Sequence, residues 1–108
     1  MDINEYQTKA AEFAVFPRTL GLIYPVLGLV GEAGEVAEKL KKILRDNDGW
    51  MSEEQKHEFA KEIGDVLWYI ATISGFLGYN LSDIADMNLG KLQSRKSRNV
   101  LNGSGDNR

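Results

Sequence analysis

The sequence contains no cysteine, a single histidine and only two prolines among its 108 residues. The lack of cysteine excludes a disulfide framework and a thiolate metal site. A formal net charge of -3 argues against general nucleic-acid binding but is compatible with a nucleotide ligand. No apolar run is long enough to span a bilayer, and the N-terminus lacks the basic-then-apolar form of a secretion signal. We therefore expect a cytoplasmic protein that binds neither membranes nor nucleic acids.

Strand-like alternation and internal repeats are also absent, and apolar residues recur at helical spacing instead. A chain of this length predicts one domain, residues 1–108, with a modest core that a partner subunit could help to cover. We predict an all-α fold in the form of a four-helix bundle. The expected helices cover about residues 4–16, 25–45, 53–78 and 82–97, and a loose polar tail, 99–108, follows them.

The expected helix boundaries depend on a few capping and breaking residues. Pro17 ends the first helix, and Pro25 suits the first turn of the second because a missing N–H is tolerated there. Ser52 followed by Gln55 is a capping-box signature at the start of the third helix. Ser82 is the expected N-cap of the fourth helix.

Two acidic steps, Glu32-x-x-Glu35 and Glu62-x-x-Asp65, place paired carboxylates on one face of consecutive helices. Glu35 lies ten residues before the predicted turn and Glu62 ten residues after it. Both therefore lie about 15 Å from the turn, so an antiparallel hairpin brings the pairs to one level. Four such carboxylates would raise one another's pKa values unless a cation is present.

The ligand types in these steps favour a hard cation. Carboxylate oxygens suit Mg²⁺, with Mn²⁺ as a substitute, and argue against zinc. A di-iron site needs a Glu-x-x-His motif from two helices, and the one histidine, His57, is not at such a position. The alternative is a set of ordinary solvated helix acids that face neighbouring lysines: Lys39, Lys41 and Lys42.

The order of these motifs resembles that of the MazG-like all-α nucleoside triphosphate pyrophosphohydrolases. The matching segments are Gly28–Val36, Lys61–Tyr69, Asn88-x-x-Lys91-Leu92-x-x-x-Arg95 and the tail Gly103–Arg108, with 26 residues between the two acidic steps. The resemblance implies the MazG fold, assembly as a dimer or a dimer of dimers, and hydrolysis of a nucleoside or deoxynucleoside triphosphate to the monophosphate and pyrophosphate. It also implies Mg²⁺ held by Glu32, Glu35, Glu62 and Asp65.

The resemblance further implies roles for individual side chains. Glu35 is our choice for the general base, with Glu32 and Glu38 as alternatives. Lys91 and Arg95, at i and i+4 on one helix face, become phosphate ligands; otherwise they form a solvated basic helix end. Asn88 would orient a phosphate or a metal-bound water. Lys39 either reaches a phosphate or pairs with Glu35 along its own helix.

Aromatic residues suggest the nucleobase contact and the oligomer. By resemblance, the base would lie beside the first helix, with five candidate contacts: Tyr6, Gln7, Phe13, Phe16 and Trp50. Trp68 and Tyr69 are more readily interpreted as core or interface residues. Together with Phe76 they give the third helix apolar surface on more than one side, which independently predicts a dimer.

Three functions from different classes fit these observations. The first is the pyrophosphohydrolase, either in nucleotide-pool house-cleaning or in control of an alarmone or toxin-linked pathway. The second is a non-catalytic helical dimer module that binds nucleotide or metal. The third is a purely structural helix-bundle dimer. Completeness of the acidic residues together with Lys91 and Arg95 favours the enzyme.

Overall fold

The computed structural model describes residues 1–108, and all its regular elements are helices. The prediction of an all-α fold with four main helices is confirmed. They are α1 (Ile3–Ala10), α2 (Ile23–Asn47), α3 (Glu53–Phe76) and α4 (Leu81–Ser97). The first helix is shorter than predicted, because the chain tightens into a 3-10 turn at Ala11–Phe13; a second 3-10 turn, Arg18–Leu20, precedes α2. No helix combines the length and apolarity that a bilayer crossing needs.

Of the two predicted N-caps, the structure confirms the one at α3 and not the one at α4. At α3 the predicted capping box forms, with Ser52 N donating to Gln55 at 2.9 Å and Gln55 N donating to Ser52 at 3.1 Å. At α4 the predicted N-cap, Ser82, is wrong. Asn80 is the N-cap instead, and its N–H donates to the Asp83 carboxylate at 3.1 Å. Ser82 lies inside the helix and bonds to the side chain of Asn4 on α1.

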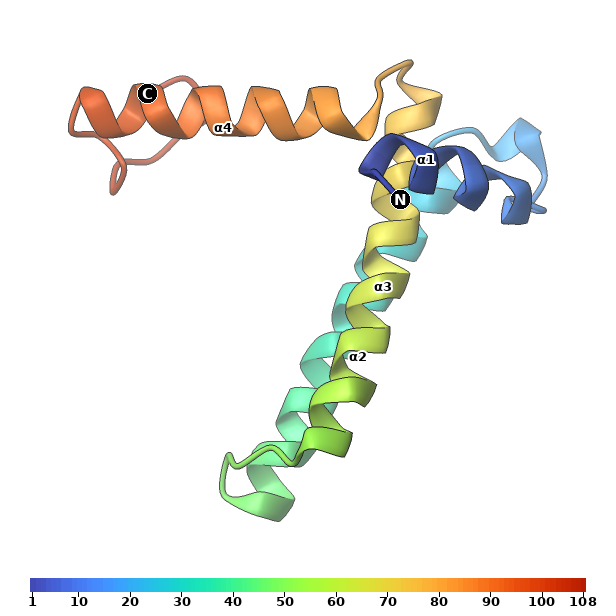
Figure 1. The fold of residues 1–108 in the computed structure, drawn as a ribbon, viewed down its shortest axis with the longest axis vertical. Coiled ribbons are helices and arrows are strands. Elements are labelled where there is room, and N and C mark those ends of the chain that lie inside the picture. Colours follow the sequence, from blue (N-terminus) through green and yellow to red (C-terminus); the bar gives the residue numbers. More distant parts are fainter.

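The helices form two arms (Figure 1). Helices α2 and α3 run side by side as a long antiparallel hairpin with the most extensive interface in the chain, and α1 crosses one end of it. There the indole Nε1 of Trp68 donates to the carbonyl of Ala10 at 3.0 Å, which fixes α1 against α3. Helix α4 leaves the same end at a steep angle and extends as a separate arm.

The single chain buries little of its apolar surface. Only seven of 108 residues are buried, and the radius of gyration is 16.8 Å, against about 13 Å for a compact domain of this length. Helix α2 turns one face towards α3, where Pro25 and Ile43 are buried. Its outer face remains open, since Leu27 is 67% and Val30 65% exposed. The four helices are therefore not packed side by side within one chain.

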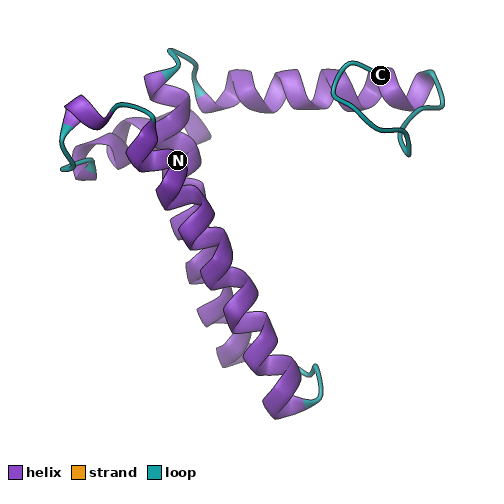
Figure 2. Cartoon of the chain, turned by 180° about the vertical axis from the view of Figure 1, so that it is seen from behind, coloured by secondary structure: helices purple, strands orange, loops and turns teal.

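The C-terminal tail is folded back rather than loose. After α4, Asn99 adopts a left-handed φ of 56°, and Val100 N donates to the carbonyl of Arg95 at 2.9 Å, as in a Schellman motif. Arg108 then closes the loop by donating to the carbonyls of Val100 and Leu101. Seen from behind, the loop lies along the end of α4 (Figure 2). The expectation of a loose tail was wrong because Arg108, with Arg95 and Arg98 at the end of α4, donates hydrogen bonds to the backbone carbonyls of the tail.

Candidate metal centre

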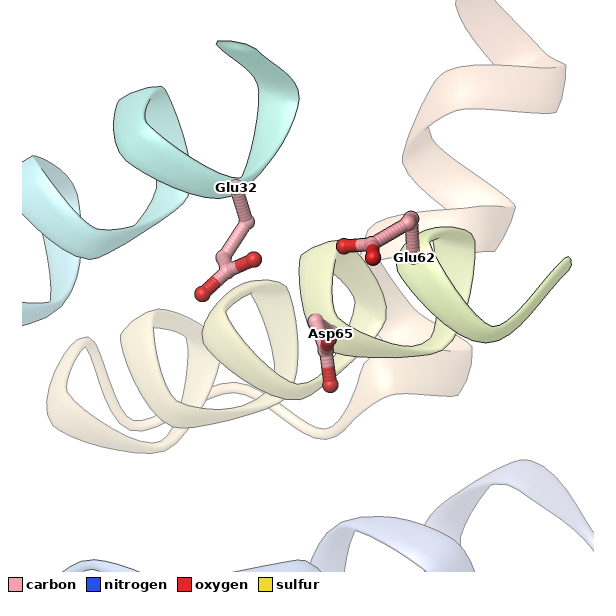
Figure 3. Close-up of side chains that lie close together, drawn as sticks. All are labelled: Glu32, Glu62 and Asp65. Atoms are coloured by element: carbon pink, nitrogen blue, oxygen red, sulfur yellow. The ribbon is translucent and has the colours of Figure 1, made fainter. Parts of the chain in front are cut away.

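Three of the four predicted carboxylates meet between α2 and α3. Glu32 projects from α2, while Glu62 and Asp65 project from α3, and one oxygen of each lies within 4.8 Å of the others (Figure 3). For these three carboxylates, the prediction that the two acidic steps lie at the same height along the hairpin is therefore confirmed. Glu32 and Glu62 are half-buried and Asp65 is exposed, so the cluster lies at the edge of the helix interface and is open to solvent.

The cluster carries a net negative charge, which the ammonium of Lys39, 3.5 Å from Glu62, offsets only in part. Burial, and then the charges of Asp65, Glu62 and Glu35, raise the pKa of Glu32 above its ordinary value. Two tyrosines lie close enough to respond to the same charges. The pKa of Tyr6 is raised by burial and by Asp65, and the pKa of Tyr69 by burial, with smaller contributions that include Glu32 and Asp65.

A close approach of the two helices supports this arrangement. A β-carbon on residue 28 would overlap the ring of Tyr69, so Gly28 is required for the aromatic ring to lie against α2. Tyr69 also packs edge-on against Trp68, with 4.9 Å between ring centroids. Gly28 lies one turn before Glu32 on the same face of α2, so this contact helps to set the distance between Glu32 and α3.

The remaining charged residues nearby divide into paired and unpaired groups. Glu35 is exposed and makes no ion pair. Glu38, an alternative base, pairs with Lys41 at 3.0 Å, which lowers the pKa of its carboxyl. The prediction that Lys39 pairs with Glu35 was wrong. Its ammonium reaches across to α3 instead, 3.5 Å from Glu62 and 3.8 Å from Glu58.

The donor set fits a hard divalent cation. It consists only of carboxylate oxygens, which Mg²⁺ and Mn²⁺ prefer, and their mutual repulsion would be relieved by a bound cation. Lys39 partly neutralises Glu62 but lies on the Glu58 side of the cluster. The three carboxylates and the nearby Glu35 are therefore the residues that could hold a metal.

Comparison with known proteins identifies the family of the chain. Residues 25–100 match the model of the MazG nucleotide pyrophosphohydrolase domain. This stretch contains α2 except its first two residues, all of α3 and α4, and all the acidic and basic motif residues. The chain belongs to the MazG family. It is also 47% identical over 114 aligned positions to the Gene 37 protein of Mycobacterium phage L5, and the alignment covers the whole of both chains. No solved structure matches.

The basic motif of this MazG domain lies away from the carboxylates. Asn88, Lys91 and Arg95 share one face of α4, as predicted. Lys91 is about 15 Å along α4, and Asp65 about 16 Å before the end of α3, so the steep angle between the helices separates them. Within the chain, Lys91 and Arg95 contact Asp106 of the folded tail instead.

The predicted base contacts lie at two different ends of the hairpin. Tyr6 is half-buried beside Asp65, and Phe16 stacks on Tyr24 with 4.5 Å between centroids. Phe13 is 69% exposed. Trp50 lies in the turn between α2 and α3, at the opposite end from α1. The structure therefore does not bring Trp50 together with the residues of the first segment.

Gln7 cross-links three elements. Its amide nitrogen donates to the carbonyls of Ala71 and Tyr79, at 3.4 and 3.0 Å, and its oxygen accepts from Leu81 N at 2.9 Å. These bonds join α1 to the end of α3 and to the first turn of α4. Gln7 therefore has a structural role that its helical position alone did not reveal.

The structure shows two features that the sequence motifs did not predict. A cavity of about 330 Å³ lies between the first segment and α3, with Arg18, Thr72 and Phe76 in its lining. The second is Asp106, which faces the basic motif. Sequence signals existed for both: Arg18 is the single basic residue between Lys9 and Lys39, and Asp106 is the single acidic residue after Asp86.

Proposed function

We propose that the chain hydrolyses nucleoside or deoxynucleoside triphosphates to the monophosphate and pyrophosphate, with Mg²⁺ as the cofactor and Mn²⁺ as a substitute. The observation that carries this proposal is the meeting of Glu32, Glu62 and Asp65 at one point of a MazG domain. A house-cleaning role, the removal of non-standard or excess nucleotides, follows from this reaction.

In the proposed site, Glu32, Glu35, Glu62 and Asp65 hold the metal. The metal would neutralise phosphate oxygens and lower the pKa of a nearby water. The chain itself supplies the proton acceptor, for which we propose Glu35. Its support is comparative: Glu32 belongs to the cluster and Glu38 is paired with lysine, whereas Glu35 is exposed and unpaired.

The proposed phosphate ligands are the cationic residues of α4, Lys91 and Arg95, with Asn88 one turn earlier on the same face. Arginine suits this role because its planar guanidinium can donate two parallel hydrogen bonds to a phosphate. Lys39 is a further candidate, since its ammonium already lies 3.5 Å from Glu62 at the edge of the cluster.

For the nucleoside we propose the side of the hairpin that α1 crosses, with Tyr6, Gln7, Phe13 and Phe16 as neighbours. The cavity of about 330 Å³ supports this choice, because small-molecule sites begin at about this size. Thr72, in its lining, lies two turns beyond Asp65 on the same face of α3, so about 10 Å separates the cavity from the carboxylates. A triphosphate can span such a gap.

We also propose that the active form is a homodimer, alone or within a dimer of dimers. The outer face of α2 exposes a row of large apolar residues, Ile23, Leu27 and Val30, each about two-thirds exposed. Large exposed apolar patches mark interaction sites. The separation of α4 from its own cluster supports a site completed between chains, in which Lys91 and Arg95 of one chain serve the carboxylates of the other.

Product analysis tests the reaction. The purified chain, supplied with Mg²⁺ and a panel of ribo- and deoxynucleoside triphosphates, should release monophosphate and pyrophosphate rather than diphosphate and phosphate. Absence of product from every nucleotide, with nucleotide still bound, would support the non-catalytic binding module instead.

Substitution of one metal ligand tests the site. Glu62→Gln should lower kcat/KM by about 100-fold or more, because a metal contributes several kcal/mol to stabilising the transition state. Glu54→Gln is the matched control, since it makes the same change on the same helix at an exposed position outside the cluster. Retention of full activity by Glu62→Gln would refute the metal assignment.

A further inference from the structure

The basic motif of α4 already holds an anion from its own chain. One carboxylate oxygen of Asp106 lies 3.0 Å from the ammonium of Lys91 and 3.4 Å from the guanidinium of Arg95. The same guanidinium nitrogen, Nη2, also donates to the backbone carbonyls of Asp106 at 2.8 Å and of Gly105 at 3.4 Å. A lysine and an arginine that converge on one oxygen form a seat for an anion.

The seat is not saturated by this carboxylate. The Arg95 side chain is only 8% exposed, and its Nε is buried without a hydrogen-bond partner. Buried donors are almost always paired, so an orphan donor on a buried guanidinium indicates that a further acceptor belongs there. The Asp106 carboxylate brings only one of its two oxygens to Lys91 and Arg95, whereas a phosphate group presents three oxygens and can therefore accept from more of their donors.

The occupant is held weakly, whereas the loop that carries it is held firmly. The Asp106 side chain is 83% exposed, and exposed ion pairs contribute little free energy. The loop is closed by Arg108, which donates to the carbonyls of Val100, Leu101 and Gly105 at 2.7–2.9 Å. None of these bonds uses the Asp106 carboxylate, so the loop does not depend on it.

We propose that Asp106 is a built-in stand-in for a substrate phosphate, which occupies the Lys91–Arg95 seat and is displaced when a triphosphate or pyrophosphate binds. The inference rests on the proposed function, in which Lys91 and Arg95 are phosphate ligands. Asp106 thereby sets the affinity of the site: it weakens phosphate binding, which raises KM and favours release of pyrophosphate.

Calorimetric titration with inorganic pyrophosphate, at one fixed ionic strength and without turnover, tests this role. Asp106→Asn removes the competing charge and should tighten pyrophosphate binding by about two- to fivefold, the effect of one exposed ion pair. Asp86→Asn removes the same charge from another exposed position on α4 and should leave the affinity unchanged. Circular dichroism of both variants checks that the helices are retained.

The outcomes separate this inference from the proposed function. If the wild-type chain hydrolyses triphosphates but Asp106→Asn binds pyrophosphate no more tightly than Asp86→Asn, Asp106 is only a structural contact and the inference fails alone. If Asp106→Asn gains affinity although no triphosphate is hydrolysed, the seat stands and the proposed reaction fails. Among active chains, Asp106→Asn should lower KM without raising kcat, and Asp106→Ala should show the same change.

Discussion

Glu32 is the residue at which the apo fold and cation binding are most directly linked. Burial and the neighbouring carboxylates raise its pKa above the ordinary 4.5. A raised pKa means that the folded chain takes up a proton more readily than the unfolded chain. Ionised Glu32 therefore destabilises the apo fold above its folded pKa, and this cost disappears as the pH falls through that value. A bound cation would remove the same cost without protonation.

This linkage predicts pH-dependent metal binding. Mn²⁺ or Mg²⁺ should bind more tightly at about pH 7.5 than at about pH 5, and binding in the acid range should release protons from the carboxyls. Calorimetric titrations in two buffers of different ionisation enthalpy measure both the affinity and the protons released. Glu32→Gln should weaken binding and reduce proton release. Equal affinity at both pH values, with no protons released, would contradict a carboxylate site.

At the scale of single elements, the α2–α3 hairpin could be predicted and the direction of α4 could not. The meeting of Glu32 with Glu62 followed from counting residues along two uninterrupted helices joined by a clear turn. The course of α4 depends instead on tertiary hydrogen bonds from Gln7 to the α3–α4 turn, which have no periodic signature. The family resemblance implied that Lys91 and the carboxylates bind one triphosphate. Because the direction of α4 has no signal in the spacing, the sequence did not reveal that the fold separates these residues within one chain.

Substitution of Gln7 tests whether its hydrogen bonds hold α1, α3 and α4 together. Gln7→Ala removes the hydrogen bonds that join α1 to α3 and α4, and should lower the free energy of unfolding by about 1–3 kcal/mol without any nucleotide present. Thr8→Ala is the control, because its hydroxyl bonds only to Asn4 of its own helix. Urea titration measures both. Unchanged stability with a higher KM for nucleotide would instead make Gln7 a ligand contact.

At the scale of the whole molecule, the chain is extended, with a radius of gyration of 16.8 Å, and it leaves much of its apolar surface exposed. Helix α2 buries only Pro25 and Ile43, and its residues Leu27 and Val30 remain largely exposed. Helix α4 also extends from the hairpin with little of its length in contact (Figure 1). A second chain can cover both surfaces at once. In the proposed dimer, the α4 of each chain would lie at the acidic cluster of the other, so that assembly would complete the proposed catalytic site.

Mixing two inactive variants distinguishes a shared site from a site within one chain. Glu62→Gln disables the acidic cluster and Lys91→Ala disables the basic motif. Lys91 is preferred to Arg95 because Arg95 also donates to backbone carbonyls of the tail, whereas Lys91 contacts only the exposed Asp106 carboxylate. If α4 acts on the partner, each mixed dimer regains one intact site. Equal amounts of the two variants, exchanged through mild denaturant, should then recover about a quarter of wild-type activity, since half the dimers are mixed and one site in two is complete.

If α4 acts on its own chain, every site in every dimer lacks one element and no activity returns. Native mass spectrometry of the same samples distinguishes the mixed dimer from the two parental dimers, so an absence of activity with mixed dimers present would overturn the shared site.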